Sequence, residues 1–191
     1  MPNINTFVQN LKGGGARANQ FQVQITATPA GVALGEEFTF LCRSAQIPAM
    51  TIGEVAVPYR GRQVFVAGDR TFDAWTTTVF SDAAWSIRGN LEKWSNSMQD
   101  MGNWSYGLKG PQDYYGEATV TQMDRNDSAV NKYTLYNLWP QTIDPIDLAY
   151  DTNDAVMEFG VTWRFNYMDS GAGGGTVAGS GAPGTVGSAG R

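Results

Sequence analysis

The sequence predicts a mainly β protein, an antiparallel β-barrel or sandwich with one flanking α-helix. Apolar and polar residues alternate in several segments, for example over residues 20–28, and a period of two is typical of half-buried strands. Clusters of Gly, Pro, Asn and Asp separate these segments, as turns require. One window, residues 82–101, instead places its apolar residues at helical spacing.

The strands follow one another along the chain. In the first, Phe21, Val23 and Ile25 point to one face, while the glutamines between them point to the other. A second expected strand, FTFLCRSAQIP, is stopped by Pro48. Further strands are expected over residues 51–57, 63–66, 70–81, 117–123, 132–140, 143–151 and 154–169.

The helix is expected to cover an open end or side of the sheet. Its apolar residues fall on one face, at Ile87, Leu91, Trp94, Met98 and Met101. A side chain just before the helix, from Ser81 or Asp82, can cap its start, and Gly102 can adopt the left-handed conformation at its end.

Two turns are predicted in the second half of the chain. The turn DRNDS, residues 124–128, places oxygen ligands at alternate positions, but it lacks the glycine and the closing glutamate of a calcium loop. A solvated hairpin tip is therefore the favoured interpretation. The last pair of strands is expected to join through a turn at Thr152 and Asn153.

Composition divides the chain into three parts. Residues 1–20 are polar, contain a glycine hinge at 13–15 and are predicted to form an N-terminal arm. Residues 21–169 hold the β domain, and residues 170–191 form a Gly/Ser/Ala-rich extension, a composition typical of flexible coil. Such an extension has no core of its own and would need another chain to hold it, which indicates that the protein is part of an assembly.

The charge balance argues against nucleic-acid binding. The net charge is −5, whereas proteins that grip nucleic acid usually carry basic patches that contact phosphate. Charged residues make up only 16% of the chain, and so low a fraction indicates that part of the protein surface is buried against partners. The sequence shows neither a signal peptide nor an apolar stretch long enough to span a membrane.

The sequence predicts no enzyme, no cofactor and no metal site. There is no histidine to act as a general base or metal ligand. Cys42 is the single cysteine and is expected to be a small core or interface residue. Acidic pairs such as Glu36–Glu37 could serve a glycosidase, but any acidic chain has them.

The tryptophans leave a carbohydrate-binding β-sandwich open as an alternative. Aromatic faces stack on sugars, and the chain has six tryptophans. Trp94 lies on the apolar face of the expected helix, and Trp139 and Trp163 lie in expected strands, so most are better explained as core. Trp104 lies in a loop flanked by glycines, and its sequence context does not distinguish between a core residue and a sugar-binding one.

Four segments together resemble the tail tube proteins of contractile-tailed bacteriophages. They are ARANQFQVQI, IPAMTIGEVAVPYRGRQVFVAGDRTF, SDAAWSIRGNLEKW and YTLYNLWPQTIDPIDLAYDTNDAVMEFGVTWRFNYM, in this order between Ala16 and Met168. The Val-Pro-Tyr-Arg-Gly run and the Pro-Ile-Asp-Leu link are the more specific details. The N-terminal arm fits the family in character only, and the extension after Ser170 has no counterpart in it.

The resemblance implies a structural protein without enzymatic activity. Members of the family form hexameric rings that stack into a hollow tube inside a contractile sheath, the conduit for genome ejection. The implied partners are further copies of the chain, the sheath protein, a baseplate tube-initiator, a tape measure protein in the lumen and a tail terminator. DNA passes through without specific binding. The implied location is the virion tail, assembled in the host cytoplasm. A tube of a type VI-like or pyocin-like secretion or injection system is an alternative.

Under this resemblance three sets of residues are candidates for contacts. The segment from Ile47 to Phe72 is expected to be an extended loop that reaches an adjacent ring, through Val57, Pro58, Tyr59, Arg60, Gly61, Arg62 and Arg70. Polar strand faces are expected to line the lumen, through Gln20, Gln22, Gln24, Asp73, Glu117, Thr119 and Thr121. The polar face of the helix is expected to face the sheath, through Arg88, Glu92, Lys93 and Asn96. Six copies would carry a net charge of about −30 (6 × −5), which fits a lumen that repels phosphate.

Overall fold

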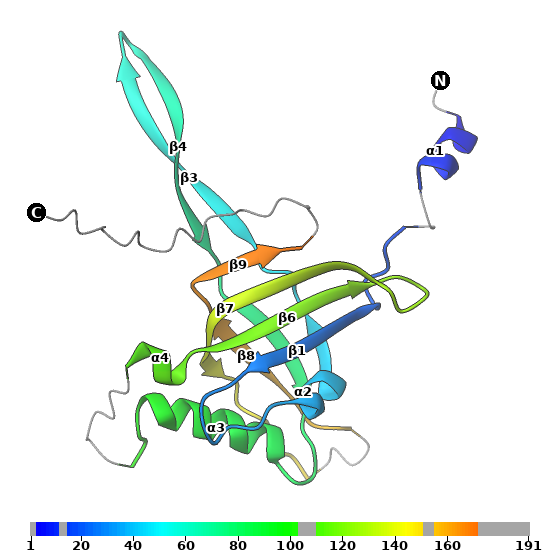
Figure 1. The fold of residues 1–191 in the computed structure, drawn as a ribbon, viewed down its shortest axis with the longest axis vertical. Coiled ribbons are helices and arrows are strands. Elements are labelled where there is room, and N and C mark those ends of the chain that lie inside the picture. The colour runs from blue at the N-terminus through cyan, green and yellow to red at the C-terminus, as the bar shows by residue number, and fades with distance from the viewer. Residues whose placement is uncertain (1–2, 12–14, 103–109, 151–154, 172–191) are drawn as a thin grey trace, which may run out of the picture.

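The computed structural model describes residues 3–11, 15–102, 110–150 and 155–171. Two antiparallel sheets form the body of the protein, a long two-stranded hairpin projects from it, and one long helix packs against it (Figure 1). The sequence-based expectation of an antiparallel β fold with a flanking helix is confirmed, and of the two forms expected the sandwich fits, because the sheets do not close into a barrel.

Sheet A holds four strands in the order β1-β6-β7-β9, namely β1 (Phe21–Ala27), β6 (Gly116–Met123), β7 (Ala129–Ile143) and β9 (Tyr167–Ser170). Sheet B continues from the end of β7 through β8 (Glu158–Arg164) and β5 (Trp75–Phe80) to β2 (Cys42–Ala45). The long strand β7 thus belongs to both sheets. Asn137 has a φ of 57° where β7 leaves β6 and joins β8, a conformation that Asn tolerates better than most residues.

Three buried tryptophans organise the core between the sheets. Trp94 and Trp75 lie against Trp163, with ring centroids 5.6 and 6.1 Å away. Each indole N–H has an acceptor: Trp75 donates to Gln46 O, Trp94 to Tyr114 O and Trp163 to Thr77 Oγ1, at 2.7–2.9 Å. Their burial cost is therefore offset, and none of the three has a face available for a sugar.

The other three tryptophans differ from this group. Trp85 is exposed and Trp139 is half-buried, so Trp139 only partly meets the expectation that it is core. Trp104 lies outside the described residues.

Helix α3 (Ser86–Met98) closes one end of the sandwich. Its buried face is Ile87, Leu91 and Trp94, as the spacing predicts. Trp94 reaches Gly116 of β6, where a Cβ would lie 2.5 Å from the Trp94 ring. The helix ends at Met98, so Met101 lies beyond it and is exposed, against expectation.

Asp82 caps the start of α3. Its carboxylate accepts hydrogen bonds from the N–H of Ser86 at 3.0 Å and of Ile87 at 3.4 Å. Desolvation alone would raise the pKa of Asp82, but these hydrogen bonds outweigh it and hold the pKa below its usual value. At the other end the expected left-handed glycine is wrong, because the helix is closed by Gln99 and Gly102 has no positive φ.

The expected strand FTFLCRSAQIP is partly wrong. Its first half belongs to helix α2 (Glu36–Leu41), and only Cys42–Ala45 form a strand. Phe38 and Leu41, three residues apart, pack toward the core, whereas Phe40 is 82% exposed. Glu36 and Glu37 in the first turn favour the helix, because acidic side chains stabilise its positive end.

The expected last pair of strands also differs from the structure. β7 ends at Ile143, so residues 144–150 form a connection and not a strand. The segment 154–169 contains two strands, β8 in sheet B and β9 in sheet A, because the chain changes sheets at Phe165 and Asn166. The expected turn at Thr152 and Asn153 lies outside the described residues.

The projecting hairpin is formed by β3 (Met50–Tyr59) and β4 (Arg62–Phe72), and is longer than the two short strands expected there. Its two-residue turn, Arg60 and Gly61, has φ values of 47° and 78°, as a turn matched to the strand twist requires. Two short helices complete the fold, α1 (Ile4–Asn10) in the N-terminal arm and α4 (Pro111–Tyr114) before β6.

Candidate assembly surfaces

The described residues were predicted from the sequence to hold no metal site, and their acidic side chains and single cysteine are spread over the fold. No group of three His, Cys, Asp or Glu side chains in these ranges could hold a metal ion. Burial raises the pKa of the Cys42 thiol to about 11, so it stays protonated and packs beside the core. None of the helices described is long and apolar enough to cross a membrane. The surfaces predicted to make contacts lie on exposed edges and faces of the fold.

The hairpin carries many of the exposed large apolar side chains in the described part of the chain. Alternation along β3 and β4 puts apolar side chains on both faces of this two-stranded ribbon. One face carries Val55, Val57, Tyr59, Val64 and Val66, and the other carries Ala56, Pro58, Phe65 and Ala67. Exposed apolar patches of this kind mark interaction sites, so both faces of the hairpin are candidates for contact with another chain.

The predicted inter-ring residues occupy two places on this hairpin. Residues 57–62 form its tip, where the Arg60 guanidinium lies 5.5 Å from the Tyr59 ring. Arg70 pairs with Ile52 near the base, so it is not part of the tip. Of the ion pairs in the described residues, Arg43–Glu158 and Arg88–Glu92, neither involves a hairpin arginine.

Sheet A has two open edges, at β1 and at β9 (Figure 1). Met123 N–H donates to Gln20 C=O at 2.9 Å, so the backbone groups of the alternate residues Phe21, Val23 and Ile25 turn away from β6. At the other edge, Gly171 N–H donates to Lys132 C=O at 2.7 Å, so the Ser170 N–H points away from β7. Such groups are templates for pairing with another chain.

The outer face of sheet A is polar. Strand register places on it Gln22, Gln24, Glu117, Thr119, Thr121, Lys132, Thr134, Tyr136, Tyr167 and Asp169. Tyr136 and Tyr167 stack there, with ring centroids 4.8 Å apart. Five of the seven predicted lumen residues belong to this face, and Gln20 lies just before it.

Two of the predicted lumen residues behave differently. Thr119 is only 4% exposed, because its neighbours on both adjoining strands cover it. Asp73 does not belong to this face, since it lies between β4 and β5, where its N–H approaches Ala49 C=O at 3.4 Å.

The four residues on α3 that are predicted to face the sheath differ in their contacts and exposure. The Arg88 side chain turns into the body: it donates to Asp144 C=O at 3.0 Å, pairs with Glu92 at 3.0 Å and lies 5.3 Å from the Phe159 ring centroid. Asn96 has a buried side-chain oxygen. Glu92 is half-exposed and Lys93 is exposed, so of the four residues these two are the most accessible to a partner.

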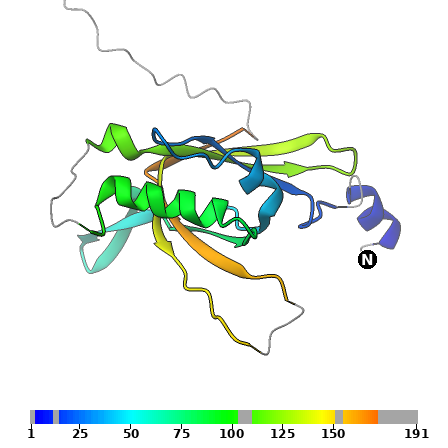
Figure 2. The same ribbon diagram turned by 90° about the horizontal axis from the view of Figure 1, so that it is seen from below.

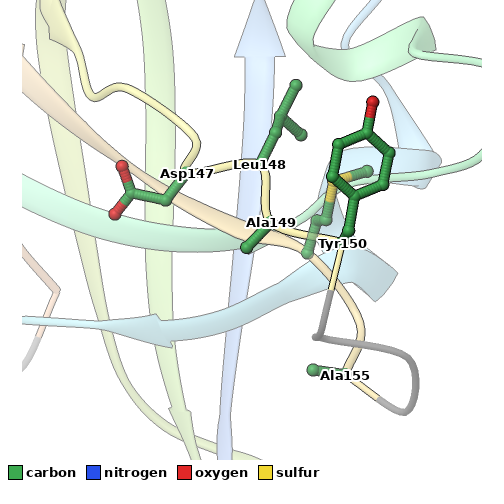
Figure 3. A pocket seen from close by; sticks show the side chains of 6 residues that line it. Asp147, Leu148, Ala149, Tyr150 and Ala155 are labelled. Atoms are coloured by element: carbon green, nitrogen blue, oxygen red, sulfur yellow. The ribbon is translucent and has the colours of Figure 1, made fainter.

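Sequence reasoning missed the connection between β7 and β8. Leu148, Tyr150, Val156 and Met157 are exposed there. A cavity of about 470 Å³ in this connection is lined by Leu148, Tyr150 and Met157 among others (Figure 3). Ile146, Leu148 and Tyr150 alternate at a period of two, which mimics a strand. Their lack of a core-facing partner strand is visible only in three dimensions.

Open sheet edges, a two-faced apolar hairpin and a polar sheet face together define a subunit that joins copies of itself. The chain belongs to the phage tail tube protein family, whose model matches residues 16–169. Members of this family are structural proteins and components of the virion tail. The family predicted from the sequence is thus confirmed.

Curated relatives agree over most of the chain. Tail tube protein gp19 of Enterobacteria phage T4 is 35% identical over 158 residues, which cover 82% of this chain and 93% of the relative. The tail tube protein of Serratia phage KSP90 is 24% identical over 169 residues, covering 86% and 95%.

Solved structures share the fold at low sequence identity. A chain of the anti-feeding prophage baseplate has a TM-score of 0.60 at 10% identity, with 81% of this chain and 94% of that chain covered. A chain of the sheath–tube complex of an extracellular contractile injection system, PVC, has a TM-score of 0.56 at 11% identity, covering 85% and 95%.

Proposed function

We propose that six copies of this chain join edge to edge through sheet A, and that the rings stack through the hairpin into the tube for genome ejection. The chain acts as a structural subunit and not as an enzyme. The observation that carries this proposal is the pair of open edges on one sheet whose outer face is polar.

The strand directions suit ring closure. Along sheet A the strands β1, β6, β7 and β9 alternate in direction, because every neighbouring pair is antiparallel. When β9 of one copy meets β1 of the next, this alternation continues without a break. Six copies of four strands would form a closed barrel of about 24 strands, with no free edge left in the ring. The sixfold symmetry of the baseplate with a similar chain supports the number six.

The polar face of sheet A is assigned to the lumen. Its amides and hydroxyls offer no cationic surface, and its charged residues are Glu117, Asp169 and Lys132. A wall of this kind holds few groups that could grip phosphate, so DNA would slide past it. A tape measure protein would occupy the same space before ejection.

The hairpin is assigned to ring stacking. It extends well beyond the body, and its two apolar faces would be covered when it lies between elements of adjoining copies (Figure 1). A hairpin that contacts a different surface on the next copy makes a heterologous contact, which builds an open stack. Arg60 and Arg62 at the tip would then meet acids of the adjacent ring. Baseplate and terminator proteins would cap the two ends of the stack.

A secretion or injection tube is the second candidate. The fold relatives in the anti-feeding prophage and the PVC system favour it, since they belong to such machines. The phage relatives are closer in sequence, at 35% against 10–11% identity, and favour the phage tail. The carbohydrate-binding alternative is disfavoured, because Trp75, Trp94 and Trp163 are buried in the core.

Ser170→Pro tests the ring contact. Proline removes the N–H that points to the open edge of β9 and leaves the Gly171 hydrogen bond to β7 in place. We expect negative-stain microscopy to show rings and tubes for wild type and for the matched control Ser170→Ala, and few or none for Ser170→Pro. Equal tube yield from all three proteins would contradict the edge-to-edge contact.

A further inference from the structure

The short helix α1 carries an apolar face that its own subunit leaves uncovered. Ile4, Phe7 and Val8, with Leu11 at the C-cap, follow one helical stripe and are 44–75% exposed. No residue of α1 is buried. A helix of seven residues is unstable in water unless an apolar face packs against a partner. These four side chains therefore form a contact surface, which we call the arm stripe.

The helix that carries the arm stripe has no charge. Residues 3–11 contain no Asp, Glu, Lys or Arg, and the polar side chains among them are amides and one hydroxyl. Charge attraction would thus contribute little to the binding of α1. The surface that covers the arm stripe should accordingly be apolar and uncharged as well.

A slot with these properties opens at one end of the sandwich. At the other end, where β6 begins, Trp94 of α3 reaches Gly116. The slot lies where β6 ends and β1 begins, and its volume is about 140 Å³. We call it the end slot. Its walls are uncharged and mostly apolar, and include Ala18, Phe21, Ala45, Ile47, Val120 and Tyr133.

The volume of the end slot matches one aromatic ring. A cavity of about 150 Å³ with apolar walls accepts a benzene molecule. Phe7 is the aromatic member of the arm stripe, and its side chain is 65% exposed. Phe21 and Tyr133 in the slot wall can pack against the ring of Phe7. The rest of the arm stripe would then cover Ile47, which is 53% exposed.

The N-terminal arm leads α1 away from the end slot of its own subunit. Its root is fixed beside the slot, because Arg17 C=O accepts hydrogen bonds from Gln122 Nε2 at 2.8 Å and from Gln20 N–H at 3.2 Å. Gly15 has a φ of 81°, a left-handed conformation that glycine adopts without strain. The helix α1 stands clear of the body (Figure 1). It lies at the far end of the molecule from α3 (Figure 2).

We propose that the arm stripe of one copy docks at the end slot of another copy, with Phe7 inserted into the slot. This inference rests on the proposed tube function and adds a third contact to edge pairing and the hairpin. Stripe and slot are different surfaces of the same chain, so the contact is heterologous and can continue from copy to copy. The end slot includes Phe21 of β1, the edge strand assigned to the ring contact, so the two contacts would adjoin.

Disulfide trapping in assembled full-length protein tests which copy holds the helix. In a Cys42→Ala background, Ile47→Cys is combined with Ile4→Cys or with Val8→Cys, so that Phe7 remains in place. Gln9→Cys with Ile47→Cys is the matched control, because Gln9 is exposed on the opposite face of α1. After oxidation we expect a ladder of covalent multimers from the stripe variants on a nonreducing gel, and mainly monomer from the control.

The critical concentration for tube formation gives a second measurement. Phe7→Ser removes the ring, and Ala18→Leu fills the slot from an exposed position. Each should raise the critical concentration roughly tenfold or more. The double variant should cost little more than either change alone, because both remove the same contact. Gln9→Ser should polymerise like wild type.

Several results would overturn the inference. An equal ladder from the Gln9 control is one, and a disulfide confined to the monomer, which would place α1 in its own slot, is another. Polymerisation of Phe7→Ser at the wild-type concentration, or full additivity with Ala18→Leu, would also overturn it. A folded wild-type protein that forms no tubes would overturn the proposed function, whereas intact tubes without the ladder would overturn this inference alone.

Discussion

Removing apolar surface from the hairpin should weaken ring stacking without unfolding the subunit. Val57 and Val64 are cross-strand partners, 46% and 52% exposed. The hairpin projects from the body, and neither residue belongs to the core cluster. The double variant Val57→Ser with Val64→Ser therefore leaves the sandwich intact and changes only the surface that we assign to the neighbouring ring.

The expected effect follows from the area still open to burial. Fully burying a valine side chain is worth about 1.5–3 kcal/mol, and roughly half of each of these side chains remains available. The pair should thus contribute about 1.5–3 kcal/mol per subunit to stacking. At about 1.4 kcal/mol per tenfold change, the critical concentration for tube formation should rise roughly 10- to 100-fold.

Sedimentation of tubes over a dilution series measures this critical concentration, and circular dichroism reports whether the subunit stays folded. Val156→Ser is the matched control, because it changes an exposed valine in the connection between β7 and β8, away from the hairpin. We expect the control to polymerise like wild type. An unchanged critical concentration for the hairpin variant, with both proteins folded, would refute burial of the hairpin between rings.

Three further predictions concern the hairpin tip, the core and the helix cap. Arg60→Glu with Arg62→Glu should shorten or abolish tubes in negative-stain images while rings persist; tubes of normal length would count against the arginine contacts. Gly116→Ala should cost about 1–3 kcal/mol in urea denaturation, because its Cβ would lie 2.5 Å from the Trp94 ring, whereas Gly89→Ala, with open space around it, should be neutral or stabilising; equal effects would contradict this packing. The pKa of Asp82 is lower in the folded state than in the unfolded chain, so Asp82 should stabilise the fold fully above about pH 4 and lose this effect as pH falls through the folded pKa. Asp82→Asn should therefore flatten the dependence of the free energy of unfolding on pH in this range. An unchanged slope would contradict the cap.

Patterns that report burial were read correctly from the sequence. The alternation in residues 21–27 gives a strand with Val23 and Ile25 in the core, and the spacing of Ile87, Leu91 and Trp94 gives a helix face. These signals succeed because local period and burial coincide. These patterns fail around Phe38. Phe38, Phe40 and Cys42 alternate in the sequence as in a strand, but Glu36–Leu41 form a short helix that packs Phe38 into the core.

Surfaces were harder to assign. Alternation along β3 and β4 resembles that of an ordinary buried strand, yet both faces of the hairpin are exposed in the single subunit. Arg88 looked like a solvated residue on a polar helix face, but its partner Asp144 is 56 residues away in the chain. Contacts of this kind depend on tertiary structure, so the sequence pattern could not show which polar residues remain free for partners.

The placement of charge shows the same limit. The net charge alone suggested an acidic lumen, but the charged residues on the polar face of sheet A are Glu117, Asp169 and Lys132, which nearly balance. The net charge of a chain does not show on which face of the fold the charged residues lie. Only the strand register shows that the face assigned to the lumen is nearly neutral.

The most direct test of the account is a cryo-EM reconstruction of assembled tubes at a resolution that shows backbone carbonyls. We expect continuous backbone hydrogen bonding from β9 of one subunit to β1 of the next, with Gln22, Gln24 and Thr121 facing the bore. Subunits that meet through side chains alone, with both edges of sheet A left unpaired, would contradict it.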